Sequence, residues 1–144
     1  MTGTVQFVCT SKKKGMVKRP VASIRLVEDH GVDGDAHAGP GHRQVSLLAE
    51  ADIDAQRALG LDLEPGAFGE NLVVTGLDLT RVGIGSRLAI GNAEIEVTQI
   101  GKECHHGCAI RRAVGDCVMP RRGIFTRVIR GGRINRESEC YYDL

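Results

Sequence analysis

The chain has 144 residues, which favours a single domain over residues 1–144 with enough surface to bury a core unaided. It contains no Trp, three Phe and two Tyr, so the core must be aliphatic and few side chains can stack on nucleic-acid bases. With a formal net charge of +1, the composition argues against a nucleic-acid partner. The sequence has no signal-peptide pattern and no apolar run of membrane-spanning length, and its five cysteines are an odd number. We therefore expect reduced thiols, a cytoplasmic location and no membrane partner.

Short runs of alternating or β-branched residues, separated by Gly-rich turns, dominate the chain. They predict strands at 4–10, 21–27, 44–48, 72–75, 87–90 and 94–98, a strand or helical turn at 123–129, and a late strand in the polar tail. Gly91-Asn92 is a good hairpin turn between two of them. Helical periodicity is confined to 49–59, with a second short helix expected at 108–114. This pattern predicts a mainly β fold, a β-barrel with one or two short helices.

Charge is unevenly distributed along the chain. Residues 101–136 carry nine Lys/Arg against two Asp/Glu, whereas residues 44–80 carry one Arg against seven Asp/Glu. The basic segment is expected to attract a small anion such as a phosphate. The alternative is that the two segments are solvated faces that hold parts of the molecule together, and such complementary faces would also allow a homodimer.

The segment 99–108 concentrates more reactive side chains than any other. It follows a strand pattern and contains two cysteines, two histidines, a lysine and a glutamate. Cations around a thiol lower its pKa and stabilise the thiolate. We therefore predict Cys104 as the reactive residue, supported by Lys102, His105 and His106. The alternative is a small buried hydrophobic residue, the usual state of a free cysteine.

The same segment also suggests a metal site. Cys104 and Cys108 could act as metal ligands or as attacking and resolving thiols, and with one of His105 or His106 and with Cys117 they form a candidate zinc site. Structural zinc usually takes its ligands from two closely spaced pairs. This segment supplies one such pair.

Two Gly-rich loops carry polar residues that could line a ligand pocket. Asp35 and His37 lie in the loop 30–42, and Glu70 and Asn71 close the loop 65–72. Each has a structural alternative, because Asp and Asn side chains also form turns. Four arginines could bind a phosphate in bidentate fashion or could be solvated surface charges: Arg111, Arg112, Arg121 and Arg122.

Several of these motifs occur in an order that resembles a known family. Gly34-Asp35-x-His37 is followed by Val45-Ser-Leu-Leu, Pro65-Gly-x-Phe-Gly-Glu-Asn-Leu72, Gly83-x-Gly85, and Thr98-Gln99 with a cysteine five residues later. In this order they resemble the MOSC domain, the C-terminal module of molybdenum cofactor sulfurases, here as a short stand-alone form. One box departs from the pattern. Many members read Gln-Pro-Arg-x-Pro-Cys, whereas this chain reads Gln99-Ile-Gly-Lys-Glu-Cys104.

The resemblance implies a strand-rich barrel and a role in molybdenum or tungsten cofactor metabolism. Cys104 would carry sulfur as a persulfide or ligate the metal of a pterin cofactor. The donor would be a cysteine desulfurase, and the acceptor the molybdenum cofactor or its enzymes. The arginines and the two Gly-rich loops would hold the cofactor. Whether the protein is itself an enzyme stays open at this point, since sulfur transfer would make it transferase-like.

Two alternatives remain open beside this one. The first is a zinc-binding structural or regulatory module. The second is a cofactor-dependent reductase unit whose electron carriers lie on other chains.

Overall fold

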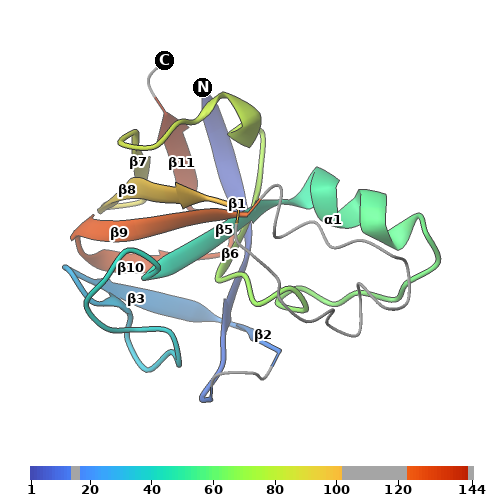
Figure 1. The fold of residues 1–144 in the computed structure, drawn as a ribbon, viewed down its shortest axis with the longest axis horizontal. Helices are drawn as coiled ribbons and strands as arrows, with labels where there is room; N and C mark the ends of the chain where they lie inside the picture. The colour runs from blue at the N-terminus through green and yellow to red at the C-terminus, as the bar shows by residue number, and fades with distance from the viewer. Residues whose placement is uncertain (14–16, 102–122, 143–144) are drawn as a thin grey trace.

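The computed structural model describes residues 1–13, 17–101 and 123–142 (Figure 1). Strands account for most of the regular structure in this part of the chain. They are β1 (Thr2–Thr10), β2 (Arg19–Val21), β3 (Ser23–Val27), β4 (Gly31–Val32), β5 (Val45–Ala49), β6 (Leu72–Thr75), β7 (Arg87–Ile90), β8 (Ala93–Ile100), β9 (Ile124–Arg130), β10 (Gly132–Asn135) and β11 (Glu139–Tyr142). One α-helix, α1 (Glu50–Arg57), and one 3₁₀ turn (Leu79–Arg81) complete the described elements.

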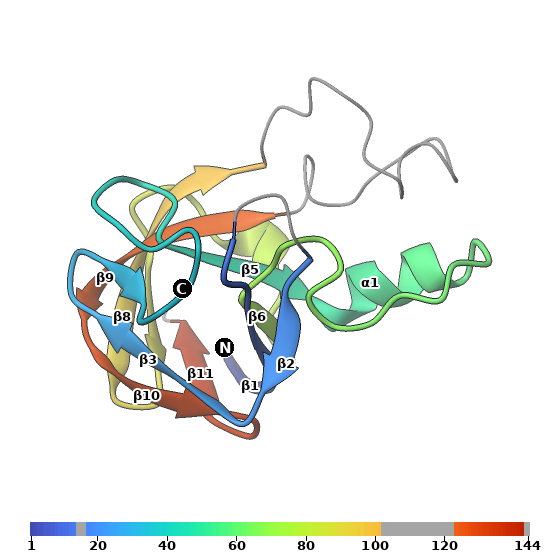
Figure 2. The same cartoon turned by 90° about the horizontal axis from the view of Figure 1, so that it is seen from below.

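Seven strands close into a barrel in the order β1, β11, β7, β8, β9, β5 and β6, with β6 returning to β1 (Figure 2). All neighbours are antiparallel except β5 and β6, which run parallel. Strand β2 extends the sheet from β1, and a second sheet in the order β10, β3, β4 packs on the same core. The predicted mainly β barrel is confirmed.

Alternation along the strands fills the barrel with aliphatic side chains. In β8, Ala93, Ile95 and Val97 are buried, whereas the residues between them are partly exposed. Strand β1 departs from this rule, because Val5 and Val8 are three residues apart and both belong to the barrel core. The pairing of β1 with β6 shifts register between Val5 and Phe7, so β1 contains one extra residue and the side chain of Val8 again faces the core.

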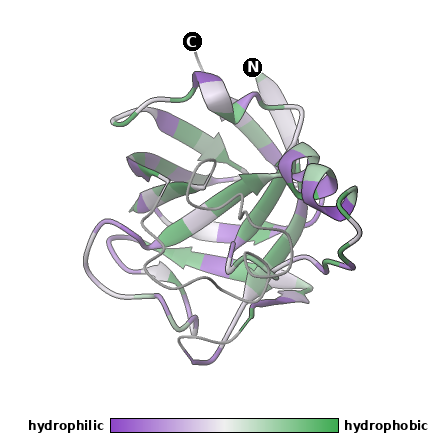
Figure 3. Cartoon of the chain, turned by 45° about the vertical axis from the view of Figure 1, so that its right-hand side comes forward, coloured by the Kyte–Doolittle hydropathy of each residue, from purple (hydrophilic) through white to green (hydrophobic). Residues whose placement is uncertain are grey.

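A smaller apolar cluster lies on the outer face of the barrel. Leu48 of β5, Val73 of β6 and Phe125 of β9 pack there against Ile53 of α1 and Phe68 of the following loop. Figure 1 shows α1 and that loop beside the barrel wall, and Figure 3 shows that α1 is largely hydrophilic while the strands are hydrophobic. The outer cluster therefore fixes the loop against β5 and β6, next to the site described below.

The sequence located most elements but missed some boundaries. The strand predicted at 21–27 is two strands, because residues 19–21 pair with β1 and residues 23–26 pair with β10. The helix predicted at 49–59 is shorter at both ends. The segment 123–129, predicted as either a strand or a helical turn, is a strand. The helix predicted at 108–114 lies outside the described residues.

Among the described residues, none of the helices combines the length and apolarity that crossing a membrane would require.

Replacing Leu47 by Ala tests the barrel core. Leu47 is fully buried between β6 and β9, so its truncation leaves a cavity and should lower the free energy of unfolding by about 2–5 kcal/mol. Urea denaturation measures this. Ile84→Ala is the control, because Ile84 is 70% exposed and its truncation should cost less than about 0.5 kcal/mol. Equal losses for both variants would contradict the packing described here.

Candidate functional site

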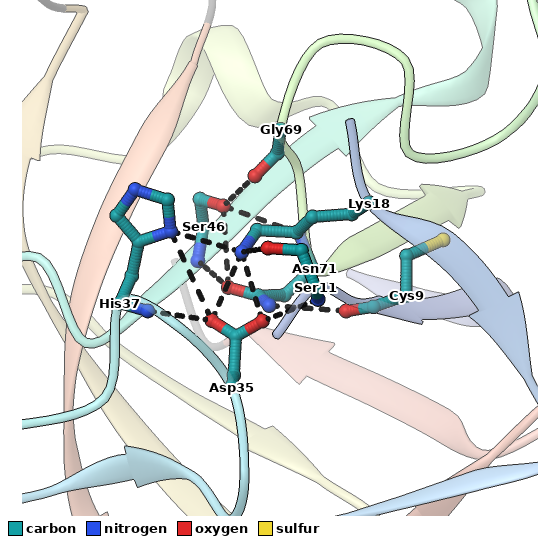
Figure 4. A network of polar contacts seen from close by, with 8 residues as sticks. All are labelled: Cys9, Ser11, Lys18, Asp35, His37, Ser46, Gly69 and Asn71. Atoms are coloured by element: carbon teal, nitrogen blue, oxygen red, sulfur yellow. Dashed lines mark hydrogen bonds and ion pairs between the residues drawn. The ribbon is translucent and has the colours of Figure 1, made fainter. Parts of the chain in front are cut away.

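A buried lysine organises the loops at one end of the barrel. Lys18 is 2% exposed, and its Nζ donates to both carboxylate oxygens of Asp35 at 2.8 and 2.9 Å and to Ser11 Oγ at 3.3 Å. The Nδ1 atom of His37 lies 2.9 Å from the same nitrogen (Figure 4). We call Ser11, Lys18, Asp35 and His37 the Lys18 cluster. It joins the segment after β1 to the Gly-rich loop that precedes β5.

Asp35 is fully occupied by groups of the chain itself. Besides Lys18, its oxygens accept the backbone N–H groups of Ser11 at 2.9 Å and of His37 at 3.2 Å. Burial alone would raise the pKa of Asp35, but the hydrogen bonds from Lys18 and from the two N–H groups outweigh burial and hold that pKa below its usual value. Asp35 is therefore a charged anchor for Lys18, and it also makes the turn that the sequence allowed as its alternative role.

Glu70 holds the loop 65–71 together from within. Its side chain is completely buried, and its oxygens accept N–H groups from Gly66 at 2.9 Å and Phe68 at 3.0 Å. Burial raises the pKa of this carboxyl group above its ordinary value, although the backbone N–H groups oppose that shift. Gly66 in turn accepts the backbone N–H of Lys18 at 3.0 Å. The loop and the Lys18 cluster thus form one connected structure.

Asn71 joins three strands of the barrel rather than forming a turn of its own. Its Oδ1 accepts the backbone N–H of Ser46 in β5 at 3.1 Å, and its Nδ2 donates to the carbonyl oxygen of Cys9 in β1 at 3.0 Å. Ser46 Oγ also donates to the carbonyl oxygen of Gly69 at 3.2 Å. Figure 4 shows this network directly beside the Lys18 cluster. Glu70 and Asn71 therefore build the wall of the site.

A cavity of about 370 Å³ lies beside the cluster, and its lining includes one guanidinium and two imidazole groups. It is bordered by His37, Gly39, Pro40, Gly41, His42 and Arg43. The Arg43 guanidinium lies 5.3 Å from the centre of the Phe125 ring, and Arg43 Nε donates to Gln99 Oε1 at 3.0 Å. This size falls within the range of small-molecule sites, and the lining favours an anionic ligand.

Gln99 connects this cavity to the end of β8. Its Oε1 accepts from Arg43, and its Nε2 donates to the carbonyl oxygen of Gly101 at 2.7 Å. The backbone N–H of Gly101 donates to the carbonyl oxygen of Gly123 at 2.7 Å. The two ends of the segment that bears Cys104 in the sequence are therefore held together beside Gln99, which contacts the cavity-lining residue Arg43.

The two described cysteines are poor nucleophiles. Burial and the nearby Glu70 carboxylate raise the pKa of Cys9 to about 12, and burial raises that of Cys140 to about 12. Both are buried and free of disulfides. Neither thiol supplies a thiolate at neutral pH.

The structure unites some predicted residues and does not describe others. Asp35, His37, Glu70 and Asn71 lie in one connected region around the Lys18 cluster. Ten predicted residues lie outside the described part of the chain: Lys102, Cys104, His105, His106, Cys108, Arg111, Arg112, Cys117, Arg121 and Arg122. In residues 1–13, 17–101 and 123–142, no group of three His, Cys, Asp or Glu side chains could hold a metal ion.

Sequence reasoning missed Lys18, Arg43 and Gln99. Lys18 follows the exposed residues Lys12 and Lys13 along the chain, and only its position before Arg19-Pro20 distinguishes it in the sequence. Its partners are 7, 17 and 19 residues away in the chain. No local pattern therefore reveals the cluster, although the adjacency of His42 and Arg43 in a Gly-rich loop was a usable signal for the cavity.

Comparison with known proteins gives a consistent result. The family model of the MOSC domain matches residues 33–141. An uncharacterised protein of Bacillus subtilis, YflK, is 27% identical over 143 residues, covering 92% of this chain and 64% of its own length. The chain thus spans somewhat less than two thirds of that relative.

Solved structures share the fold. The YuaD protein of Bacillus subtilis has a TM-score of 0.80 at 19% identity, covering 97% of this chain and 94% of its own. YiiM from Escherichia coli has a TM-score of 0.68 at 22% identity, covering 100% of this chain and 70% of its own.

Replacing Asp35 by Asn tests the buried ion pair. The change leaves the Lys18 ammonium buried without its counter-charge, and should lower the free energy of unfolding at neutral pH by about 3–5 kcal/mol. Asp54→Asn is the control, because the Arg57–Asp54 pair at 2.7 Å is largely exposed and should contribute less than about 1 kcal/mol.

The pH dependence of the same pair has a defined sign. The pKa of Asp35 in the folded protein lies below its pKa in the unfolded chain. The charged carboxylate therefore stabilises the fold at any pH above the unfolded-chain pKa, and this stabilisation is lost as the pH falls through the folded-state pKa. The difference in free energy of unfolding between wild type and Asp35→Asn, measured by urea denaturation, should therefore become smaller at acid pH. A difference that does not change with pH would argue against a charged Asp35.

A pair of glycine variants tests the contact between the loop and Lys18. Gly66 and Gly69 both have positive φ, +93° and +81°, but a Cβ on Gly66 would lie 2.2 Å from the carbonyl oxygen of Lys18, whereas one on Gly69 meets nothing within 4 Å. Both Ala variants should incur the left-handed backbone cost of about 1–2 kcal/mol. Gly66→Ala should lose about 1–3 kcal/mol more through steric overlap. Similar free energies of unfolding for the two variants would show that the loop does not depend on this close approach.

Proposed function

The chain belongs to the MOSC domain family, whose members are associated with molybdenum cofactor-related proteins, and from this premise we propose that it handles sulfur or binds the cofactor in molybdenum or tungsten cofactor metabolism. In this proposal Cys104 is the central residue, as persulfide carrier or as metal ligand. A cysteine desulfurase supplies the sulfur, and the molybdenum cofactor or one of its enzymes accepts it. A homodimer is compatible with this role.

One observation carries the proposal. Gln99 links Arg43, which lines the cavity, to Gly101, which directly precedes the segment that bears Cys104. The side-chain amide of Gln99 accepts a hydrogen bond from Arg43 and donates one to the carbonyl oxygen of Gly101. Cys104 follows Gly101 by three residues in the sequence. The covalent chain therefore tethers the predicted thiol to the end of the barrel at which an anionic ligand would bind.

The cavity is compatible with part of a pterin cofactor. The cofactor carries a phosphate, and Arg43, His37 and His42 supply cationic or N–H donor groups around a space of about 370 Å³. Bound there, the cofactor would supply the metal-centred chemistry. The chain's own residues would hold its anionic end, and the Lys18 cluster would keep the lining loop in place.

The reactive thiol is sought among the cysteines of residues 102–122, because the two cysteines elsewhere in the chain are unsuited to the role. Cys9 and Cys140 are buried thiols whose pKa is raised to about 12. Of the five cysteines, this leaves Cys104, Cys108 and Cys117. Cys104 is the one flanked by Lys102, His105 and His106, the setting that favours a thiolate.

Sulfur transfer to Cys104 is balanced without a further reagent. The Cys104 thiolate attacks the terminal sulfur of a persulfide on the donor, the S–S bond of the donor breaks, and the donor cysteine leaves as a thiolate. The transferred sulfur becomes the terminal atom of a persulfide on Cys104. Thiolate and persulfide exchange roles, so no oxidant or reductant is consumed.

The experiment is intact-mass spectrometry of the protein, purified without reductant and incubated with a cysteine desulfurase and cysteine. Wild type should gain the mass of one sulfur atom, and reductant should remove it. Cys104→Ser should lose at least nine tenths of this adduct, whereas the matched variant Cys117→Ser should retain it.

The other outcomes separate the alternatives. An adduct that persists in Cys104→Ser would contradict the assignment of the carrier. Zinc retained in the native spectrum and lost in both Cys104→Ser and Cys108→Ser, without any sulfur adduct, would establish the zinc-binding module instead.

A further inference from the structure

Lys18 determines which nitrogen of His37 carries the proton. An ammonium group donates hydrogen bonds and cannot accept them. At 2.9 Å from Lys18 Nζ, His37 Nδ1 must therefore be the acceptor and must present its lone pair. A neutral imidazole whose Nδ1 accepts carries its single proton on Nε2.

The surrounding charges favour the same state. A proton on Nδ1 would direct an N–H group at the ammonium, and a ring protonated on both nitrogens would also place two cations 2.9 Å apart. Asp35 Oδ2 would attract such a proton, but it lies 4.0 Å from Nδ1, beyond hydrogen-bond range. The cavity lining adds the titratable His42 and the guanidinium of Arg43, and the charge of Arg43 does not favour a further positive charge. Between Lys18 and Asp35, the ammonium is thus the closer charge to Nδ1 of this ring.

Asp35 makes this arrangement stable. Its carboxylate binds the ammonium with both oxygens and is itself held by two backbone N–H groups. Lys18 therefore keeps its charge although it is buried. The three residues form a chain of fixed protonation states: carboxylate, ammonium and neutral imidazole.

We propose that Lys18 is a positioning residue that holds His37 neutral, with its proton on Nε2, at the border of the cavity. His37 is then a hydrogen-bond donor there, and whatever faces Nε2 must be an acceptor, such as an anionic oxygen. It follows that His37 neither ligates a metal nor takes up a proton at neutral pH. The protonation state belongs to the free protein, and only the class of ligand rests on the proposed function.

The test is a long-range ¹H–¹⁵N correlation spectrum of the ¹⁵N-labelled full chain, with the His37 signals assigned by His37→Gln. It is recorded about one pH unit below the ordinary histidine pKa near 6.5, where roughly ten of eleven free imidazoles are protonated. In wild type, His37 should show an unprotonated Nδ1 and a protonated Nε2. In Lys18→Met it should be doubly protonated, a rise in the charged fraction of at least fivefold.

Lys12→Met is the matched control, since Lys12 is exposed in the same segment, and it should leave the His37 signals unchanged. Should Lys18→Met fail to fold, the wild-type spectrum alone decides. A protonated Nδ1 in wild type would overturn the proposal, and so would a neutral His37 in a folded Lys18→Met. Neither readout involves Cys104, so a negative result here is distinct from a failure of the sulfur-transfer experiment.

Discussion

The buried ion pair between Lys18 and Asp35 is the interaction on which the site depends. Taking two charges out of water is costly, and the pair persists because every oxygen of Asp35 is hydrogen-bonded and the ammonium has further partners. Its benefit is local order. It fixes the segment after β1 and the loop before β5 in a position that strand pairing alone would not specify. The cavity lies on that loop, so the buried salt bridge contributes to its shape together with the hydrogen bonds of Gly39 and Arg43.

The motif residues of the loop 65–72 have an architectural role, as their contacts show. Glu70 organises the loop through backbone N–H groups, and Asn71 ties β5 and β1 to the start of β6. Substituting either would disturb the cavity without removing a ligand contact. A loss of function in such variants would therefore indicate that the loop had been displaced, not that a ligand contact had been removed. Replacing the cavity-lining residues His37, His42 or Arg43 would instead test the proposed ligand contacts.

The sequence allowed the barrel to be predicted, and it also pointed to four residues that the structure brings into one region, Asp35, His37, Glu70 and Asn71, whose role toward a cofactor stays a prediction. Alternation within strands such as β8 is a local signal, and it located the strands and the aliphatic core. The split between β2 and β3 was missed, because it depends on which distant strands pair with each half. Asp35, His37, Glu70 and Asn71 were recognised by motif, whereas Lys18 was missed, since its environment is made by residues far along the chain. For Cys104 and the arginines of the basic segment, the predictions stand as proposals.

The pairing of β1 with β11 has a consequence for how the chain folds. Thr2 pairs with Tyr141, so the contact that closes the barrel joins residues at opposite ends of the described chain. Contacts of such wide sequence separation form slowly, because a large loop must be ordered before they can form. During synthesis, β1 must wait for the last strand, and until then the edges of both β1 and β7 lack their partner. Unpaired strand edges are prone to intermolecular pairing, so the nascent chain is open to aggregation through β1 and β7 until β11 has been made.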